Sequence, residues 1–386
     1  MASRPPLRRC VLLMLSLLSA CGAAEVQPYV SSEKPAPRIE VTGAAGDYLS
    51  GRFAATHGDN ALAAELFDRG LKRDPGNPEI LQRAFMANLL AGKSDAVTLA
   101  KRLPDNIAAD LLLGNAEVKD GRWSAAETRY AALVRQGVPQ LLQPLLVAWA
   151  QQGAGKNDAA LAILRPLAEG QRFRAAYALH AALIADLAGA GYEQEAARLY
   201  RIAQAEFGGT SLQLARALAS WDVRQGKPAE AQGALNALVD ANPEMAITIP
   251  ALYAAANVRP VRTAQDGIAE AYLALAGALR GPETNDFALL LLRLALDLRP
   301  DMSAARLLSA DILDQIKQPE AALAMLQQVG DDDPLAGLVK LRKVALMDRT
   351  GDRQGALALT EALARRYPDR PEPLSMRGDI LRGEKR

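Results

Sequence analysis

Apolar residues recur at helical spacing through most of this chain. From residue 43 onward they form segments of about 12 to 15 residues, separated by short breaks rich in Gly, Asp, Asn or Pro. An apolar residue at every third or fourth position marks the buried face of an amphipathic helix, and such breaks carry the usual start and stop residues. Alanine and leucine dominate, whereas β-branched and aromatic residues are scarce, which favours helix over strand. The pattern predicts an all-α fold.

The breaks between helices return at a nearly constant interval. Intervals of 34, 29, 34, 36 and 35 residues separate the glycines Gly58, Gly92, Gly121, Gly155, Gly191 and Gly226. Later breaks, each 34 residues from the next, fall near Glu283, Lys317, Gly351 and Lys385. A period of 34 residues containing two helices resembles the tetratricopeptide repeat.

The clearest copy of the repeat spans residues 48–77. Five of its positions match the family pattern. The small residues are Gly51, Ala63 and Gly70, the large one is Phe67, and Pro75 ends the second helix. Small residues let two antiparallel helices approach closely, and a large one fills the space between them. The resemblance implies a right-handed superhelical solenoid of antiparallel helix pairs, with about nine copies over residues 43–243 and 267–386.

Two segments depart from the regular period. Residues 244–266 add 23 residues to one interval, which predicts an irregular insertion containing a helix and a loop. It is interpreted as a domain joint, a bend, a binding loop or a decayed repeat without function. The other segment, residues 371–386, predicts a single final helix that is either a terminal cap or the start of a repeat cut short.

The first 42 residues have a different composition. Residues 1–20 combine three arginines with an apolar run from Val11 to Leu18, the pattern of an export signal that is too short to span a bilayer. Residues 21–42 hold prolines and serines without helical period, which predicts a flexible tether.

The segment Leu18-Ser19-Ala20-Cys21-Gly22 resembles the lipobox of bacterial lipoproteins. That resemblance implies acylation of Cys21, a membrane anchor, and, because Gly22 rather than an aspartate follows, a place in the outer membrane facing the periplasm. The alternative is ordinary cleavage after Ala24, which would give a soluble periplasmic carrier.

The composition argues against several kinds of functional site. The chain has 45 basic side chains, three of them in the leader (Arg4, Arg8 and Arg9), so 42 remain against 44 acidic ones. Such a balance gives no long-range attraction for nucleic acid. Both cysteines, Cys10 and Cys21, precede the helical region, and only His57 and His180 are available as imidazole ligands. No metal site, cofactor or catalytic motif is therefore expected.

In the tetratricopeptide family the first helix of each pair lines a concave groove that holds a protein or peptide. Carried over position by position, this implies a groove lined by Tyr48, Arg52, Asn115, Lys119, Arg216, Arg224, Arg349 and Arg382. Recurrent guanidinium groups suit a carboxylate or an acidic peptide, although charged residues also occur on any solvated helix face.

These observations predict a non-enzymatic interaction scaffold or adaptor of the bacterial cell envelope, tethered through Cys21 and holding a protein or peptide in its groove. A second hypothesis makes the chain the non-catalytic helical part of a larger enzyme such as a transferase. The identity of the partner and the oligomeric state are not encoded in any pattern of the sequence.

Overall fold

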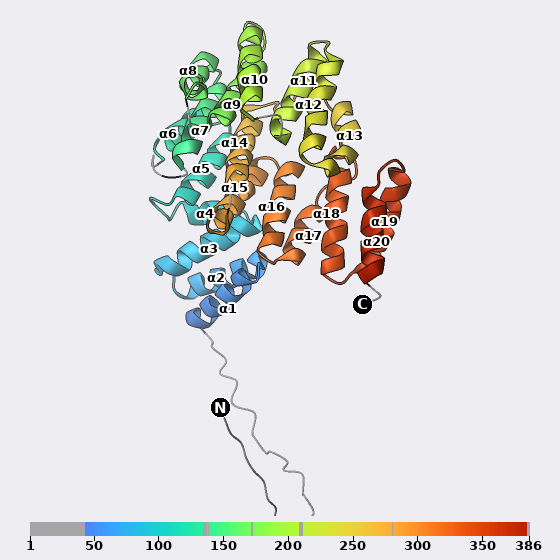
Figure 1. Cartoon of the computed structure of the whole chain (residues 1–386). Helices are drawn as coiled ribbons and strands as arrows, with labels where there is room; N and C mark the ends of the chain where they lie inside the picture. The colour runs from blue at the N-terminus through green and yellow to red at the C-terminus, as the bar shows by residue number, and fades with distance from the viewer. Residues whose placement is uncertain are drawn as a thin grey trace, which may run out of the picture. The chain divides into compact units, whose positions relative to one another are not determined.

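The computed structural model describes residues 43–133, 137, 139–170, 173–207, 211–279 and 281–383. The predicted export signal, Cys21 and the predicted tether lie outside these residues. Within the described ranges the regular structure is entirely helical (Figure 1), which confirms the predicted all-α class. Those ranges also contain no helix long and apolar enough to cross a membrane.

Ten helices form the first five pairs. They are α1 (Ala44–Thr56), α2 (Asn60–Arg73), α3 (Pro78–Ala91), α4 (Asp95–Ala100), α5 (Ile107–Lys119), α6 (Trp123–Ala131), α7 (Pro139–Gly153), α8 (Asn157–Ala168), α9 (Arg174–Ala188) and α10 (Glu193–Phe207). Each helix packs on the next one along the chain, as a solenoid of antiparallel pairs requires.

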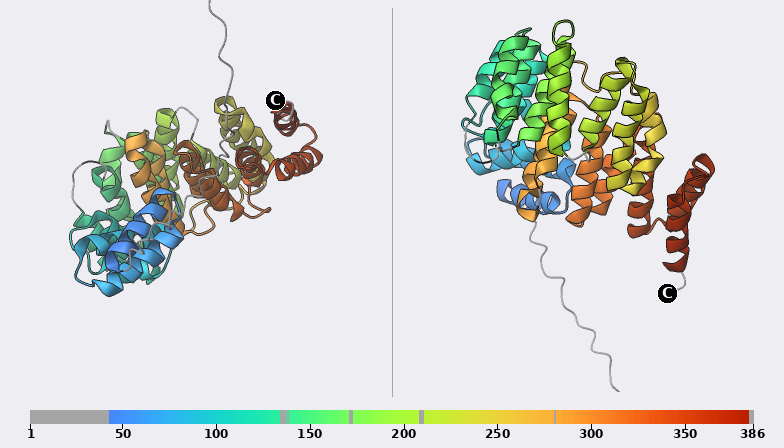
Figure 2. Two further views of the ribbon diagram at one scale, coloured as in Figure 1. Left: turned by 90° about the horizontal axis from the view of Figure 1, so that it is seen from below. Right: turned by 45° about the horizontal axis from the view of Figure 1, so that its top comes forward.

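The remaining elements continue this arrangement after an irregular stretch. They are α11 (Leu212–Arg224), α12 (Pro228–Ala241), η1 (Pro243–Ile247), α13 (Ile249–Ala254), α14 (Ala264–Ala278), η2 (Pro282–Thr284), α15 (Asn285–Leu298), α16 (Ser303–Gln315), α17 (Pro319–Gln327), α18 (Ala336–Arg349), α19 (Arg353–Arg366) and α20 (Glu372–Gly383). In both views of Figure 2, α18–α20 lie at the opposite end of the folded region from α1–α6.

The turns within pairs are built as the sequence predicts. Gly58 adopts a φ of 77° between α1 and α2, a conformation that costs glycine little and other residues more. Asp59 then caps α2 by accepting a hydrogen bond from the Leu62 amide at 3.0 Å. The other inter-helix glycines named above also have positive φ angles, namely Gly92, Gly121, Gly155, Gly191, Gly226 and Gly351.

In two of the pairs, a glycine of the first helix packs against a large aromatic side chain of the second helix. A Cβ atom added at Gly51 would lie 2.9 Å from the ring of Phe67, and one at Gly114 would lie 2.3 Å from Tyr130. Both rings are almost completely buried. This contact fixes how closely the two helices of a repeat approach.

The segment 244–266 takes the form of η1, α13, a loop and the first residues of α14. After this segment the chain returns toward its N-terminal half. Helix α14 packs on α7 and α9, and α15 packs on α5 and α3. The irregular segment thus redirects the chain, so that α14 and α15 cover the inner side of the earlier pairs.

Candidate functional site

Helices α14 and α15 occupy much of the inner surface of the N-terminal half. Trp149 of α7 is fully buried, and a Cβ atom added at Gly267 of α14 would lie 2.3 Å from its indole. The absence of a side chain at Gly267 therefore lets α14 lie directly on α7. An apolar contact of this closeness belongs to the core rather than to an open groove.

Asn115 lies in this core and not on an open groove. It is completely buried, and its Nδ2 atom donates to the Leu294 carbonyl at 3.1 Å and to Asp297 at 3.2 Å. Its Oδ1 atom accepts from the hydroxyls of Tyr272, at 3.0 Å, and Tyr130, at 3.4 Å. The prediction that Asn115 faces a partner is corrected, because every hydrogen-bonding atom of its amide is used within the fold.

The same contact engages Lys119, whose Nζ lies 2.8 Å from Asp297 on α15. Lys119 is still partly exposed, so this ion pair lies at the edge of the α5–α15 contact. Burial at this contact raises the pKa of Tyr272 well above its usual value, which keeps the phenol neutral as a hydrogen-bond donor to Asn115.

Arg224 is also engaged within the fold. Its guanidinium makes two hydrogen bonds to the Asp186 carboxylate, at 2.9 and 2.5 Å. Asp186 lies on α9 with only 4% of its side chain exposed, and it also accepts from Arg259 at 3.0 Å and from Tyr200 at 3.2 Å. Asp186 therefore links α9 and α10 to α11 and to the loop after α13, and Arg224 belongs to this link.

Of the other predicted groove residues, Arg52, Arg349 and Arg382 are exposed, whereas Tyr48 is half-buried against the core. The Tyr48 hydroxyl donates to Glu79, and the Arg52 guanidinium lies 5.8 Å from the centroid of the Tyr48 ring. The remaining two pair with nearby carboxylates, Arg349 with Asp314 at 2.7 Å and Arg382 with Asp379. The structure does not bring these four into one cluster with Arg216.

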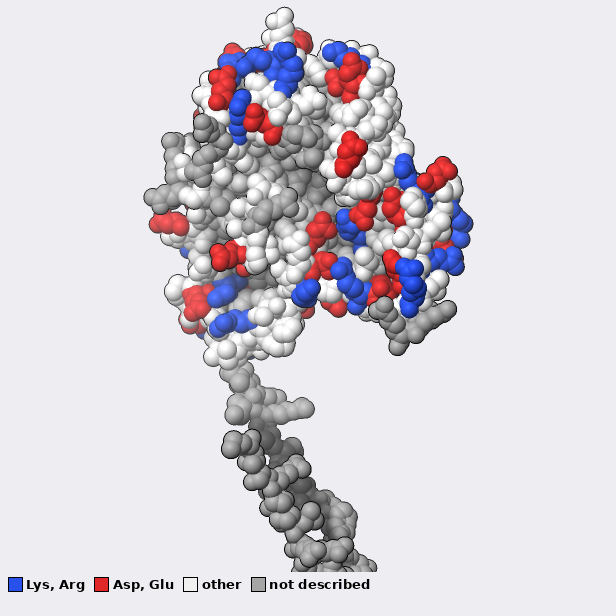
Figure 3. Space-filling model, in the orientation of Figure 1, with Lys and Arg blue, Asp and Glu red and all other residues white. Residues whose placement is uncertain are grey.

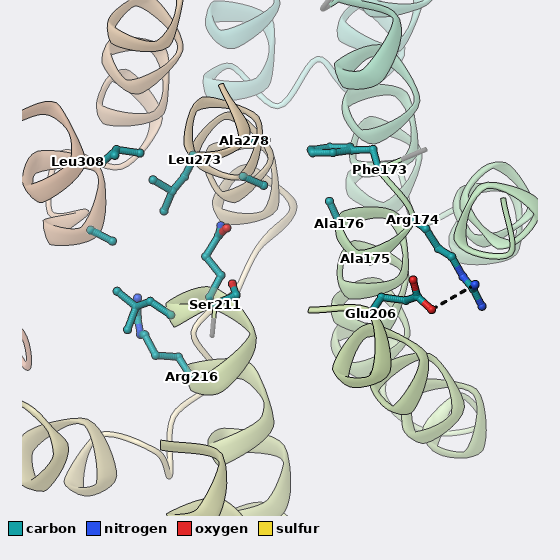
Figure 4. Close-up of a pocket in the computed structure, with 15 residues that line it drawn as sticks. Phe173, Arg174, Ala175, Ala176, Glu206, Ser211, Arg216, Leu273, Ala278 and Leu308 are labelled. Atoms are coloured by element: carbon teal, nitrogen blue, oxygen red, sulfur yellow. Dashed lines mark ion pairs between the residues drawn. The ribbon is translucent and has the colours of Figure 1, made fainter. Parts of the chain in front are cut away.

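Arg216 lies beside a cavity of about 600 Å³, here called the apolar pocket, at the joint between α9–α10 and α11–α12. Figure 4 shows the pocket, with Phe173 at the N-cap of α9, Leu273 of α14 and Leu308 of α16 around it. The ion pair between Arg174 and Glu206, 3.2 Å apart, lies on the side away from Arg216. The lining is mostly hydrocarbon with charge at its margins.

The apolar pocket is open because one helix face carries very small residues. Of the four α14 residues that line it, three are small, namely Ala274, Gly277 and Ala278, and the fourth is Leu273. A Cβ atom added at Gly277 would approach only Leu308, at 3.9 Å, so a larger side chain there would enter the cavity. On the opposite side, α11 is positioned by Ser211, whose hydroxyl accepts from the Leu214 amide at 3.3 Å.

A second cavity, of about 240 Å³, shares Arg216 with the first and is here called the arginine pocket. Its other basic lining residues are Arg259, Arg262 and Arg299, and its acidic ones are Asp301 and Asp333. The irregular segment thus contributes two arginines to a cavity next to the apolar pocket. The repeat positions do not predict this pairing, because both arginines lie in the irregular segment, in the sequence Arg259-Pro260-Val261-Arg262.

Neither histidine is placed for catalysis. His180 is fully buried, its Nδ1 accepts from the indole of Trp149 at 2.9 Å, and burial lowers its pKa to about 3. His57 is exposed and contacts the carbonyl of Phe53 in its own helix. Among the described residues no cluster of His, Asp and Glu has the arrangement of a metal site.

Comparisons with known proteins concern the fold. No family model matches the chain, and no curated protein sequence matches it. Among solved structures it is similar to a chain of the complex titled Naa15/Naa10 bound to HypK-THB, with 15% identity, a TM-score of 0.31, and coverage of 87% of this chain and 60% of that one. This chain therefore spans less than two thirds of that neighbour.

Two other neighbours are covered almost completely. Yeast Tom70 is 12% identical with a TM-score of 0.28, over 89% of this chain and 90% of that one. The TPR domain of P58(IPK) is 14% identical with a TM-score of 0.26, over 89% and 98%. Independently of these likenesses, the consecutive helix pairs and the 34-residue period give this chain a tetratricopeptide-like solenoid. These likenesses carry nothing about partners or activity.

Proposed function

We propose that this chain is a non-enzymatic adaptor that holds a segment of another protein in the apolar pocket. One observation carries the proposal. Where α14 and α15 cover the inner surface of the N-terminal half, they leave a largely hydrocarbon cavity of about 600 Å³ open at the joint between α9–α10 and α11–α12. A concave, mostly apolar site with a few polar groups at its margin is the usual form of a binding site.

The surroundings of the pocket favour a peptide over a reacting substrate. Its lining contains Ser211 and Gln213 but no histidine, lysine or paired carboxylates. Ser211 serves as the N-cap of α11, where its hydroxyl accepts from the Leu214 amide. Apolar side chains of a partner would remove hydrocarbon from water there, at roughly 25 cal/mol for each Å² buried.

The proposal places the adaptor in the bacterial cell envelope, held through a lipid on Cys21. What supports this is the sequence of the leader, in which Leu18-Ser19-Ala20-Cys21 follows a short apolar run. The periplasmic face of the outer membrane is the proposed location, because Gly22 follows the cysteine. Basic and acidic residues are interspersed on the face shown in Figure 3, which does not favour a nucleic-acid partner.

In-cell crosslinking tests the binding proposal. A photoreactive phenylalanine derivative at Leu308 points into the apolar pocket, and the same group at the exposed Leu381 of α20 is the control. We expect a discrete crosslinked protein from position 308 that is absent or much weaker from position 381. Equal crosslinking from both positions, or none from 308, would contradict the proposal.

A pocket-filling variant separates binding from folding. Gly277→Leu places a side chain into the open cavity and replaces a helical glycine by a strong helix former, which favours folding by up to about 1 kcal/mol. We expect unchanged or slightly higher thermal stability together with loss of the crosslinked partner. Retention of the partner by a folded Gly277→Leu protein would argue against the apolar pocket as its site.

A further inference from the structure

The arginine pocket contains guanidinium groups of two kinds. Arg259 is committed to Asp186 at 3.0 Å, and Arg299 lies 3.4 Å from Asp266 and 3.2 Å from Glu270. Both are held in place by buried carboxylates, and the Arg259 guanidinium shares Asp186 with Arg224. They therefore shape the wall of the cavity, and the contact with a ligand falls to the other two arginines.

Arg216 and Arg262 differ from them. Among the described residues no carboxylate lies within 4.0 Å of the Arg216 guanidinium, although that side chain lines both cavities. Arg262 approaches Asp266 only to 3.9 Å, and 64% of its side chain is exposed. These two guanidinium groups therefore keep donors that a ligand could use, and both face the same cavity.

The backbone around the cavity adds further donors. Helix α16 starts directly at the pocket, where Met302 and Ser303 belong to the lining, and Met302 provides no side-chain cap. The Met302 amide donates to the Arg299 carbonyl and the Ala305 amide to the Met302 carbonyl, both at 3.1 Å, so the amides of Ser303 and Ala304 are the ones left at this helix start. These two amides carry the positive end of the helix dipole and add to the attraction of the two arginines for an anion.

The loop that carries Arg259 and Arg262 is held in a defined conformation. Asp266 accepts from the amides of Arg262, at 2.8 Å, and Thr263, at 3.1 Å, and the Thr263 hydroxyl returns a bond by accepting from the Asp266 amide at 3.1 Å. This capping box fixes the start of α14 and the preceding residues together. The backbone at Arg262 is thereby positioned before any ligand arrives.

Two acidic residues of the lining restrict the charge of the ligand. Asp333 accepts from the Leu335 amide at 2.7 Å, and Asp301 lies exposed at the rim, 3.9 Å from Arg299. Their negative charges reduce the net positive potential of the pocket. A group with one negative charge is thus favoured over a phosphate monoester, which carries nearly two.

We propose that the arginine pocket binds a carboxylate of the same peptide segment whose apolar side chains occupy the apolar pocket. This inference rests on the proposed function. Arg216 joins the two cavities, so one extended segment can place an aliphatic side chain in one and an acidic group in the other. The irregular segment would then supply selectivity, because Arg262 comes from it and Arg259 forms part of the cavity wall.

Peptide selection tests this inference without knowledge of the natural partner. Random peptides displayed on phage are selected on the purified full-length chain, and binders that compete at the apolar pocket are identified by their loss of binding to Gly277→Leu. We expect these binders to contain an Asp, a Glu or a free terminal carboxylate near an aliphatic residue. Synthesis of each binder with a terminal acid or a terminal amide distinguishes the two sources of the carboxylate.

A double-mutant cycle measures the contact itself. Replacing the peptide's acidic group by its amide should weaken binding to the wild-type chain roughly tenfold, the effect of losing one charge-assisted hydrogen bond. In the double variant that carries both Arg216→Gln and Arg262→Gln, the same replacement should change the affinity for the peptide by less than about twofold. Arg201→Gln, which changes an exposed arginine of α10 that lines neither of these two pockets, is the matched control and should behave as wild type.

The outcomes separate the two proposals. Pocket-dependent binders that are indifferent to the acid-to-amide change would overturn the carboxylate inference and leave the apolar pocket standing. Tighter binding of a phosphoserine peptide than of its glutamate counterpart would overturn the assignment to a singly charged group. Selection of no binder that Gly277→Leu abolishes would count against both proposals.

Discussion

The Asp186 cluster gives a sharp prediction about how the two halves of the solenoid are joined. Asp186→Ala removes a carboxylate with 4% of its side chain exposed, which accepts hydrogen bonds from Arg224, Arg259 and Tyr200. The substitution leaves two guanidinium groups without their partner and the phenol of Tyr200 without its acceptor. All of these groups lie where α9 and α10 meet α11.

The expected cost follows from the burial of each group. Removing one member of a buried ion pair typically costs 3–5 kcal/mol, because the remaining charge is left without compensation. The side chain of Arg224 is 21% exposed, so its ion pair with Asp186 counts as buried. The side chain of Arg259 is 39% exposed and can be solvated after the substitution, so it adds little to the loss of stability. We therefore expect a loss of about 3 kcal/mol in the free energy of unfolding.

Urea denaturation followed by far-ultraviolet circular dichroism measures this loss, and hydrogen exchange locates it. Protection should fall first in α11 and the end of α9, since solenoids unfold by neighbouring segments. The control is Asp120→Ala, which removes a surface pair with Arg122 in which both side chains are more than half exposed, and should cost less than about 1 kcal/mol. A loss of under about 1 kcal/mol for Asp186→Ala would refute the reasoning.

Two further changes test the interior. Gly114→Val should lower stability by at least about 1–3 kcal/mol in thermal unfolding, because a Cβ atom at this position would lie 2.3 Å from the buried ring of Tyr130, and an unchanged melting temperature would contradict this. The pKa of His180 is lowered to about 3 from 6.5, so the unfolded chain binds the extra proton and stability falls as the pH falls from about 6.5 toward 3. Between pH 7 and pH 5 this should remove about 2 kcal/mol, a loss that His180→Gln abolishes and His57→Gln retains when denaturation is compared at the two pH values.

The helical repeat could be predicted because its determinants are local. Gly58 and Asp59 form a turn that depends only on neighbouring residues, and Gly51 meets Phe67 within a single pair. The period of 34 residues then places later pairs without knowledge of the superhelix.

The open part of the inner surface could not be predicted in the same way. The repeat positions assign Asn115 to the concave side, but whether that side is open depends on α15, which lies 179 residues further along the chain at Leu294. No periodic pattern encodes such a contact. The same reason hid the joint residues Leu273 and Leu308, whose shared cavity exists only after α14 has returned to α9.

Asp186 offered a signal that was not used. It is an isolated acid in the alanine-rich and leucine-rich segment of α9, and a carboxylate on such a face needs a buried partner. Its partners Arg224 and Arg259 are 38 and 73 residues away, so the need for a partner was visible in the sequence and its identity was not.

Hydrogen exchange with a bound peptide tests the central claim most directly, namely that α14 and α15 remain in place while a partner occupies the joint. A peptide selected on the full-length chain should increase protection at the start of α9, the start of α11 and residues 303–308 of α16, with α5, α7 and α15 unchanged. Protection gained instead along the inner faces of α3 and α5, together with faster exchange in α14 and α15, would show that the partner displaces these helices and would contradict the account.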